Sequence, residues 1–284
     1  MNHIVAVPNW SFCNAELAHE ADCLLRRLGV TVHYCKGDVD HQRTVTAFSG
    51  SEDVVMSAAL ELAQLLLPKI DLRVQSGVHP RIGALDVMPF VLLEGDESIL
   101  IQNCRTWAAS FSEEFEVPVH LYEKAALSGK EYRLPNLRGQ VGPTSELPDF
   151  GTVAHPNWGT TIVGVRNFLL AANINLATPD LSIARMVAKA IREKRESGDP
   201  KLVGVRALGF YLPSRNLAQL SLNFTQPDAT SFDSVFAFAE GWLQAQGISI
   251  LETELIGVIR SPDAARATRL SFAPDQVVDF SVTI

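Results

Sequence analysis

Cysteine, excess positive charge and long apolar runs are all lacking in this sequence. Its 284 residues contain only four cysteines, none of them in a C-x-x-C pair, and a chain of this length needs no disulfide staple. No window of about 18 apolar residues is free of charge, so we expect no transmembrane helix. The first residues lack both a basic segment and a long apolar run, which predicts no secretory signal. These absences together predict a cytoplasmic protein with reduced thiols.

The charge balance limits the class of partner. Lys and Arg number 24 against 32 Asp and Glu, which gives a formal net charge of −8. An acidic chain without a long basic run is a poor general binder of nucleic acid or of an anionic membrane. We therefore expect no nucleic acid and no membrane as partners.

Several chemical motifs are missing as well. The sequence has no G-x-x-x-x-G-K-[ST] phosphate loop, no G-x-G-x-x-G after its first strand and no G-x-S-x-G elbow. One pair has metal-ligand spacing, His19 and Cys23, which lie four residues apart on a predicted helix with Cys23 expected near its buried face. No second ligand pair accompanies them, so we expect no metal.

Predicted strands and helices alternate along the whole chain. The first helix shows the pattern most clearly, because its apolar residues recur at helical spacing and Gly29 follows its end. The predicted strands cover residues 3–7, 30–35, 44–48, 87–93, 117–122, 161–176, 202–212, 218–225 and 248–259. The predicted helices cover residues 15–28, 97–114 and 231–246, and two more begin at a capping Ser51 and at Thr178-Pro179.

This order predicts an α/β (α+β) fold with two split β-α-β units. The second half follows the order strand, helix, two strands, helix and strand, and the first half adds one strand and one helix to that order. Each unit should form a mostly antiparallel sheet with its helices on one face. We divide the chain at residues 1–165 and 166–284. Residues 125–157 are rich in proline and glycine and are expected to form a long functional loop.

The segment 76–86 holds the first candidate for chemistry. His79 stands next to Pro80 in a loop that contains glycine, and Arg81 and Asp86 are near it in sequence. Histidine suits proton transfer near neutral pH, and glycines allow a ligand to approach the backbone closely. The alternative is a capped turn that exposes a His-Arg pair, which is the commoner interpretation of a motif taken alone.

Two other loops could bind a ligand. Residues 148–159 combine Trp158 with small and polar residues, which suits stacking on a planar ligand, or else they form a linker with Trp158 in the core. Residues 38–43 include His41 and could bind a metal or a polar ligand, although a charged hairpin turn is the commoner explanation.

A series of motifs in a fixed order is more specific than any one of these loops. The motifs are Val7-Pro8-Asn9-Trp10-Ser11, Asp40-His41-Gln42-Arg43-Thr44, His79-Pro80-Arg81-Ile82-Gly83-Ala84-Leu85-Asp86-Val87, Pro148-Asp149-Phe150-Gly151, Asn157-Trp158-Gly159-Thr160-Thr161, Asn173-Ile174-Asn175-Leu176 and Leu217-Ala218-Gln219-Leu220-Ser221-Leu222-Asn223. In their order and spacing they resemble the glutamate formiminotransferase family. That family forms the transferase part of formiminotransferase-cyclodeaminase and also occurs as a stand-alone protein.

The resemblance implies a reaction and an architecture. The reaction is transfer of a formimino group from N-formimino-L-glutamate to N5 of the co-substrate tetrahydrofolate, a late step of histidine degradation. The implied architecture is two ferredoxin-like subdomains with a ligand tunnel between them, in a homodimer. Because the sequence stops at Ile284, the stand-alone form is expected.

The resemblance also implies site residues. The catalytic histidine of the family falls on His79. The folate-contacting segment falls on Gly151, Thr152, Val153, Ala154, His155, Pro156, Asn157, Trp158 and Gly159. We expect further support for the substrates from Asn9, His41, Arg43, Arg81 and Asp86, with the two arginines binding glutamate carboxylates and Asp86 orienting His79.

The sequence departs from the family pattern at two places. Phe12, Cys13 and Asn14 stand where the family usually has Glu, Gly and a basic residue, and Val78 stands where it usually has Glu. Two alternatives therefore stay open. One is a folate- or amino-acid-binding homologue without catalysis, and the other is a folate-dependent one-carbon transferase with another donor.

Overall fold

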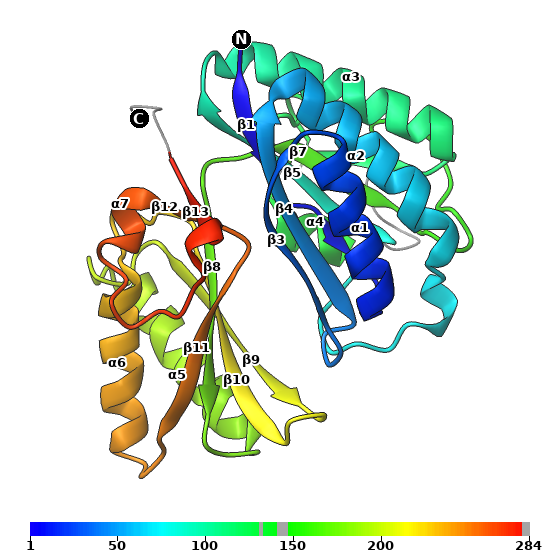
Figure 1. The fold of residues 1–284 in the computed structure, drawn as a ribbon. Coiled ribbons are helices and arrows are strands. Elements are labelled where there is room, and N and C mark those ends of the chain that lie inside the picture. Colours follow the sequence, from blue (N-terminus) through cyan, green and yellow to red (C-terminus); the bar gives the residue numbers. More distant parts are fainter. Residues whose placement is uncertain (131–132, 141–146, 280–284) are drawn as a thin grey trace. The chain divides into compact units, whose positions relative to one another are not determined.

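The computed structural model describes residues 1–130, 133–140 and 147–279. Contacts divide the chain into two compact units, residues 1–167 and residues 168–279 (Figure 1). Both are mixtures of helices and mostly antiparallel strands, so the predicted α+β class is confirmed. The ferredoxin-like assignment stays a prediction.

The first unit is built on a seven-stranded sheet. Its strands are β1 (His3–Ala6), β2 (Asn9–Trp10), β3 (Thr31–Asp38), β4 (Arg43–Ser51), β5 (Leu85–Glu94), β6 (Val119–Glu123) and β7 (Thr161–Val165). Both β1 and β2 pair with β4 on one side and with β5 on the other, and β3 pairs with the far edge of β4. These pairings are antiparallel, whereas β7 lies parallel to both β5 and β6.

Three helices cover one face of this sheet, as Figure 1 shows. They are α1 (Ala15–Arg27), α2 (Glu52–Leu66) and α3 (Glu97–Phe115). Helix α1 forms where predicted, because the Asn14 side chain accepts a hydrogen bond from the Leu17 amide and Gly29 leaves the helix at a φ of +82°. Between helices and sheet lies a core that includes the fully buried Leu25 and Phe90.

A fourth helix lies on the opposite face of the sheet and corrects the predicted loop over residues 125–157. Helix α4 (Leu134–Gln140) inserts the buried Leu137 against Val87, Tyr122 and Ile162. Neighbouring residues on β6 and β7 belong instead to the core under α1 to α3. Since successive strand residues point to opposite faces, α4 covers the other face at β5, β7 and β6. Residues 131–132 and 141–146 of the predicted loop lie outside the described part.

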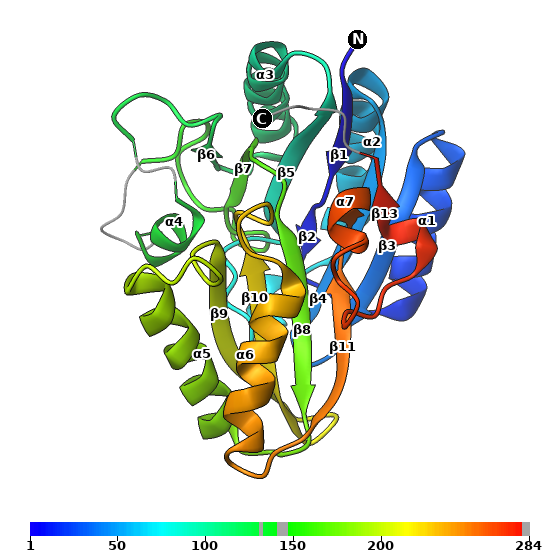
Figure 2. The same cartoon turned by 90° about the vertical axis from the view of Figure 1, so that its left-hand side faces the viewer.

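The second unit has a four-stranded antiparallel sheet in the order β11-β8-β10-β9, with two helices on one face (Figure 2). Its main elements are β8 (Leu170–Leu176), α5 (Leu181–Glu196), β9 (Val205–Leu212), β10 (Leu217–Phe224), α6 (Phe232–Gln244) and β11 (Ile250–Ile256). This order is the one predicted from the sequence. A small addition follows, made of β12 (Ile259–Arg260), α7 (Ser261–Ala264) and β13 (Val277–Val278).

Some local predictions were wrong. The apolar run 161–176 is two strands in different sheets, because the boundary between the units falls at residue 167. Helix α5 begins after Asp180, whose carboxylate accepts from the Ser182 amide, and not at Thr178-Pro179. Ser51 occupies the predicted cap position of α2, but its side chain makes no capping hydrogen bond.

The titratable side chains of α1 differ from prediction in one respect. Cys23 is exposed, not near the buried face, and its sulfur lies 3.6 Å from Nε2 of His19. Across the described residues, no group of three or more His, Cys, Asp or Glu is arranged to hold a metal ion. None of the described helices is both long and apolar enough to cross a bilayer.

Candidate functional site

An open cleft lies beside the loop that carries His79. Its volume is about 360 Å³, and its lining consists of Leu72, Gln75, Gly77, His79, Arg81 and Ile82. A space of this size accommodates a small organic substrate. The sequence-predicted His79 and Arg81 therefore face one cleft within the first unit.

Hydrogen bonds to the neighbouring β3–β4 turn hold this loop in place. The Arg81 guanidinium donates to the carbonyl oxygens of His41, at 2.6 Å, and Gln42, at 2.9 Å. A Cβ added to Gly77 would lie 2.2 Å from the His41 oxygen, so only glycine fits there. The Arg81 side chain thus mainly holds the loop against the turn through these hydrogen bonds.

The proton on the His79 ring is fixed by its neighbour. Nδ1 lies 2.9 Å from the Pro80 carbonyl oxygen, which can only accept, so Nδ1 carries the hydrogen in the neutral ring. Nε2 then holds the lone pair. The ring of His41, another predicted residue, lies 5.8 Å away from that of His79, centroid to centroid.

His79 is kept in its neutral form by its surroundings. Burial lowers its pKa well below 6.5, and the positive charges of Arg43 and Arg138 and the neighbouring His41 lower it further. Only the hydrogen bond with Pro80 opposes them by raising the pKa. At neutral pH the ring can therefore accept a proton at Nε2.

An irregularity in the sheet sets the direction of the Asp86 side chain. Asn9 pairs with Val87 but Trp10 pairs with Leu85, so Asp86 is an extra residue in β5, a β-bulge. Bulges redirect a side chain, and the Asp86 carboxylate is completely buried.

The bonds of Asp86 go to an amide and to two arginines. Oδ1 accepts from the Ile82 amide at 2.9 Å, and Oδ2 accepts from Arg43 at 2.6 Å and from Arg138 at 2.5 Å. Asp86 is thus linked through Arg43 to the loop that carries His79, and its role in orienting His79 stays a prediction.

Arg43 connects this carboxylate to the His79 loop. Its guanidinium also donates to the Pro80 carbonyl oxygen and to Oδ1 of Asn9, each at 3.1 Å. Burial lowers the pKa of Arg43 to about 10, and the charge of Asp86 opposes that effect. Arg43 remains a cation at neutral pH, and Asn9 acts as its support.

Arg138 was missed in the sequence because it falls in the predicted long loop. A local signal was available, since Leu134 and Leu137 have helical spacing and Arg138 follows directly. That signal predicts a short helix, but not the contact with Asp86, which is 52 residues away.

The second predicted loop lies directly behind the first. Backbone bonds join the Leu72 amide to the Asn157 oxygen at 2.9 Å and the Ala84 amide to the Trp158 oxygen at 2.8 Å. Gly159 forms a bridge with Gly83 and lies against Ile82 and Leu72, so it backs two lining residues of the cleft. Residues 151–154 and Pro156 are exposed.

His155 and Trp158 stabilise this second loop from within. Their rings stack at 4.2 Å with an angle of 14°, and Nδ1 of His155 accepts from the Trp158 amide at 3.1 Å. Paired backbone bonds between His155 and Gly159 close the loop. Trp158 also packs against the main core of the first unit.

Three of the residues that depart from the family pattern, Phe12, Asn14 and Val78, make contacts that stabilise the local structure. Phe12 is buried in the main core, and Asn14 caps α1. Val78 is exposed, and its backbone amide donates to the Asp40 oxygen at 3.0 Å.

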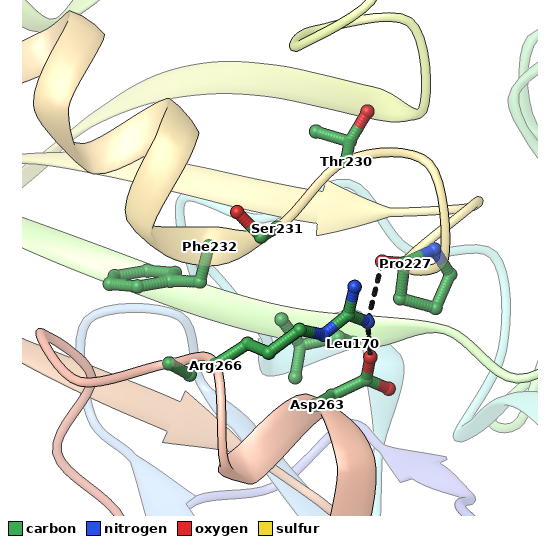
Figure 3. Close-up of a pocket in the computed structure, with 8 residues that line it drawn as sticks. Leu170, Pro227, Thr230, Ser231, Phe232, Asp263 and Arg266 are labelled. Atoms are coloured by element: carbon green, nitrogen blue, oxygen red, sulfur yellow. Dashed lines mark hydrogen bonds and ion pairs between the residues drawn. The ribbon is translucent and has the colours of Figure 1, made fainter.

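A cavity in the second unit is too small to be a substrate site. It holds about 10 Å³, the space of one water molecule. Figure 3 shows Arg266 reaching across it to Asp263, at 2.6 Å, and to the Pro227 oxygen, at 3.3 Å. Asp263 also binds the buried Arg260, so this cluster stabilises the local structure.

Family models cover nearly the whole chain. The model for the N-terminal subdomain of the formiminotransferase domain matches residues 3–166, and the model for the formiminotransferase domain matches residues 171–272. The chain belongs to the formiminotransferase family. The resemblance seen in the ordered motifs is thereby confirmed.

Named relatives of this formiminotransferase-family chain fall into two groups. Glutamate formimidoyltransferase of Thermoplasma acidophilum is 30% identical over 78% of this chain and 76% of its own length, and that of Streptococcus pyogenes is 32% identical over 81% and 79%. Mouse formimidoyltransferase-cyclodeaminase is 32% identical over 90% of this chain and 50% of its own length. The chain thus spans about half the length of the two-part relatives it matches.

Proposed function

We propose that this protein transfers the formimino group of N-formimino-L-glutamate to N5 of tetrahydrofolate, as a folate-dependent one-carbon transferase of histidine degradation. One observation carries the proposal: His79, whose Nδ1 bonds to the Pro80 carbonyl oxygen, faces an open cleft beside a buried arginine cation. The names of the relatives support the choice of substrates.

His79 moves the proton in the proposed reaction. N5 of the folate attacks the amidine carbon of the donor, and the N5–H bond becomes acidic as the N–C bond forms. His79 takes that proton at Nε2 and then returns it to the departing glutamate nitrogen, so the base is regenerated. General base catalysis of this kind contributes about 10²–10⁴-fold, and holding both substrates together adds to it.

The other predicted residues have supporting roles in this proposal. Gly151 to Gly159 contact the folate, His41 and Arg81 shape the cleft, and Asn9 and Asp86 hold Arg43. We further propose residues 1–165 and 166–284 as the two formiminotransferase subdomains, a homodimer, a cytoplasmic location and a reaction without metal.

The direct test is turnover by the purified chain. With N-formimino-L-glutamate and tetrahydrofolate both present, we expect glutamate to be released, and no release when either is omitted. Failure to release glutamate at saturating concentrations of both would overturn the proposal.

A second candidate is a folate- or amino-acid-binding homologue without catalysis. It is favoured by the structural roles of Phe12 and Asn14 at positions where the family usually has polar groups. Tetrahydrofolate binding without transfer from any amidine or formyl donor would identify it. Transfer from a donor other than formiminoglutamate would instead identify a one-carbon transferase of different specificity.

A further inference from the structure

The Arg138 guanidinium has at least one N–H group without a hydrogen-bond partner among the described residues. One nitrogen, Nη2, donates to Asp86, while the buried Nε has no hydrogen-bond partner among the described residues. A guanidinium carries five N–H donors, and Nε–H is one that the described residues leave unpaired. The Arg138 side chain is 18% exposed, compared with 10% for Arg43 and 0% for Asp86.

Positive side chains outnumber negative ones at the Asp86 carboxylate. Arg43 and Arg138 bind the same oxygen of Asp86, so two cations share one anion. Among the other groups around His79, the β3–β4 turn supplies the His41 ring and the Asp38 carboxylate, which accepts from the His41 amide at 2.8 Å, and the Arg81 cation lies 3.4 Å from the His79 oxygen. The excess positive charge at Asp86 itself is held in place by protein contacts, which is the condition for binding an anion.

The position of Arg138 is fixed relative to His79. Leu137, the preceding residue, is buried against the sheet and anchors α4. From Arg138 a continuous series of bonds leads through Asp86, Arg43 and the Pro80 oxygen to the His79 ring. An anion bound at Arg138 would therefore be linked to the base through this series of bonds.

We propose that Arg138, together with Arg43, binds a carboxylate of the amino-acid donor and so makes the site specific for an acidic amino-acid derivative. This inference rests on the proposed function and names the residue that selects its donor. A guanidinium fork matches a carboxylate in shape and charge, and Lys at this position would supply the charge alone. The charge of Arg138 also lowers the pKa of His79.

The experiment follows the His79 ring by NMR while glutarate, a dicarboxylate without a transferable group, is added. The His79→Gln spectrum assigns the signal among the seven histidines. Glutarate should shift the His79 signal and raise its pKa in the wild-type protein. Arg138→Met should weaken glutarate binding at least about tenfold, since hydrogen bonds to charged groups are worth more than one factor of ten. Its ligand-free His79 should also titrate at a higher pH than in wild type.

Two further variants control the comparison. Arg133→Met removes an exposed cation just before α4 and should leave both measurements as in wild type. Arg138→Lys keeps the charge, so it should keep the low pKa of His79 and lose part of the glutarate affinity. If Arg138→Met does not fold, the lysine variant still tests the inference through its KM for formiminoglutamate, which should rise more than kcat falls.

The outcomes separate this inference from the proposed function. Wild-type affinity for glutarate and an unchanged His79 pKa in Arg138→Met would overturn the inference even if formimino transfer is observed. Glutarate binding that depends on Arg138 in a protein without formimino transfer would support the anion site and overturn the proposed function.

Discussion

At the scale of single residues, the proposed activity depends on the tautomer of the His79 ring. The Pro80 carbonyl takes the hydrogen of Nδ1, and burial with two nearby arginines keeps the ring neutral. A base must be unprotonated to act, and its pKa is lowered here. In the proposed reaction, the neutral ring is the form that accepts the proton.

Replacing His79 tests this role directly. His79→Gln should retain the fold and tetrahydrofolate binding, because His79 lies in a loop beside the cleft and outside the apolar core of the first unit. Glutamate release should fall by about 10²-fold or more, the size expected for loss of a general base. Thermal unfolding and calorimetry check the first two expectations, and turnover at the wild-type rate would contradict the third.

The pH dependence of the wild-type rate follows from the same ring. The rate should rise with pH as His79 loses its proton, because only the neutral form accepts one. Since its folded pKa is lowered, this rise should be centred below pH 6.5, the ordinary value for histidine. A profile of kcat/KM against pH measures it, and a rise centred at or above 6.5 would show that His79 is not the base.

Trp158 gives an optical signal from the second loop. It stacks on His155 within the segment proposed to contact folate, so bound folate should quench part of the tryptophan fluorescence. The chain has four tryptophans, and Trp158→Leu should remove that part of the quenching. Equal quenching in the variant would place the folate away from this loop.

At the scale of elements, two loops and a short helix are brought together by backbone pairing and one bulge. The bulge in strand β5 orients the Asp86 side chain, and Arg138 on α4 bonds to the Asp86 carboxylate. The second loop pairs with the first through Gly83 and Gly159, where a Cβ on Gly83 would lie 2.1 Å from the Thr160 oxygen. Close backbone approach therefore explains these glycines.

Helix α1 provides a test at this scale. Asn14→Ala removes the hydrogen bond that caps α1 and should lower the free energy of unfolding by about 1 kcal/mol. Asn14→Asp preserves an acceptor and should keep most of the stability. Urea unfolding measures both, and tetrahydrofolate binding should not change. Loss of binding in Asn14→Ala would instead give Asn14 a direct role at the site.

At the scale of the whole molecule, the chain consists of two compact units that both match formiminotransferase family models. The cleft, His79 and the arginine pair all lie in the first unit. The second unit has its own sheet and core, and its described cavity holds no more than one water.

Ligand binding by the full chain is expected to be independent of metal. Calorimetry with tetrahydrofolate should give the same affinity with and without a chelator, because the proposed contacts come from side chains and backbone only. Binding that disappears with the chelator, or no heat at high ligand concentration, would contradict this.

The sequence by itself determined the class of fold, the order of most elements and the family. Periodic apolar residues and caps are local signals, so helices such as α1 and the strands of the second unit could be predicted from neighbouring residues. The ordered motifs also pointed to His79, because its loop is continuous in sequence.

Only the tertiary structure decided the chemical environment of that loop. The state of the His79 ring depends on Arg43 and Arg138, which are distant in sequence and meet at the buried Asp86. The run 161–176 belongs to two sheets, and α4 lies in a segment whose composition predicted a loop. Burial, a β-bulge and charge at short distance depend on which segments pack together, and no local pattern contains that information.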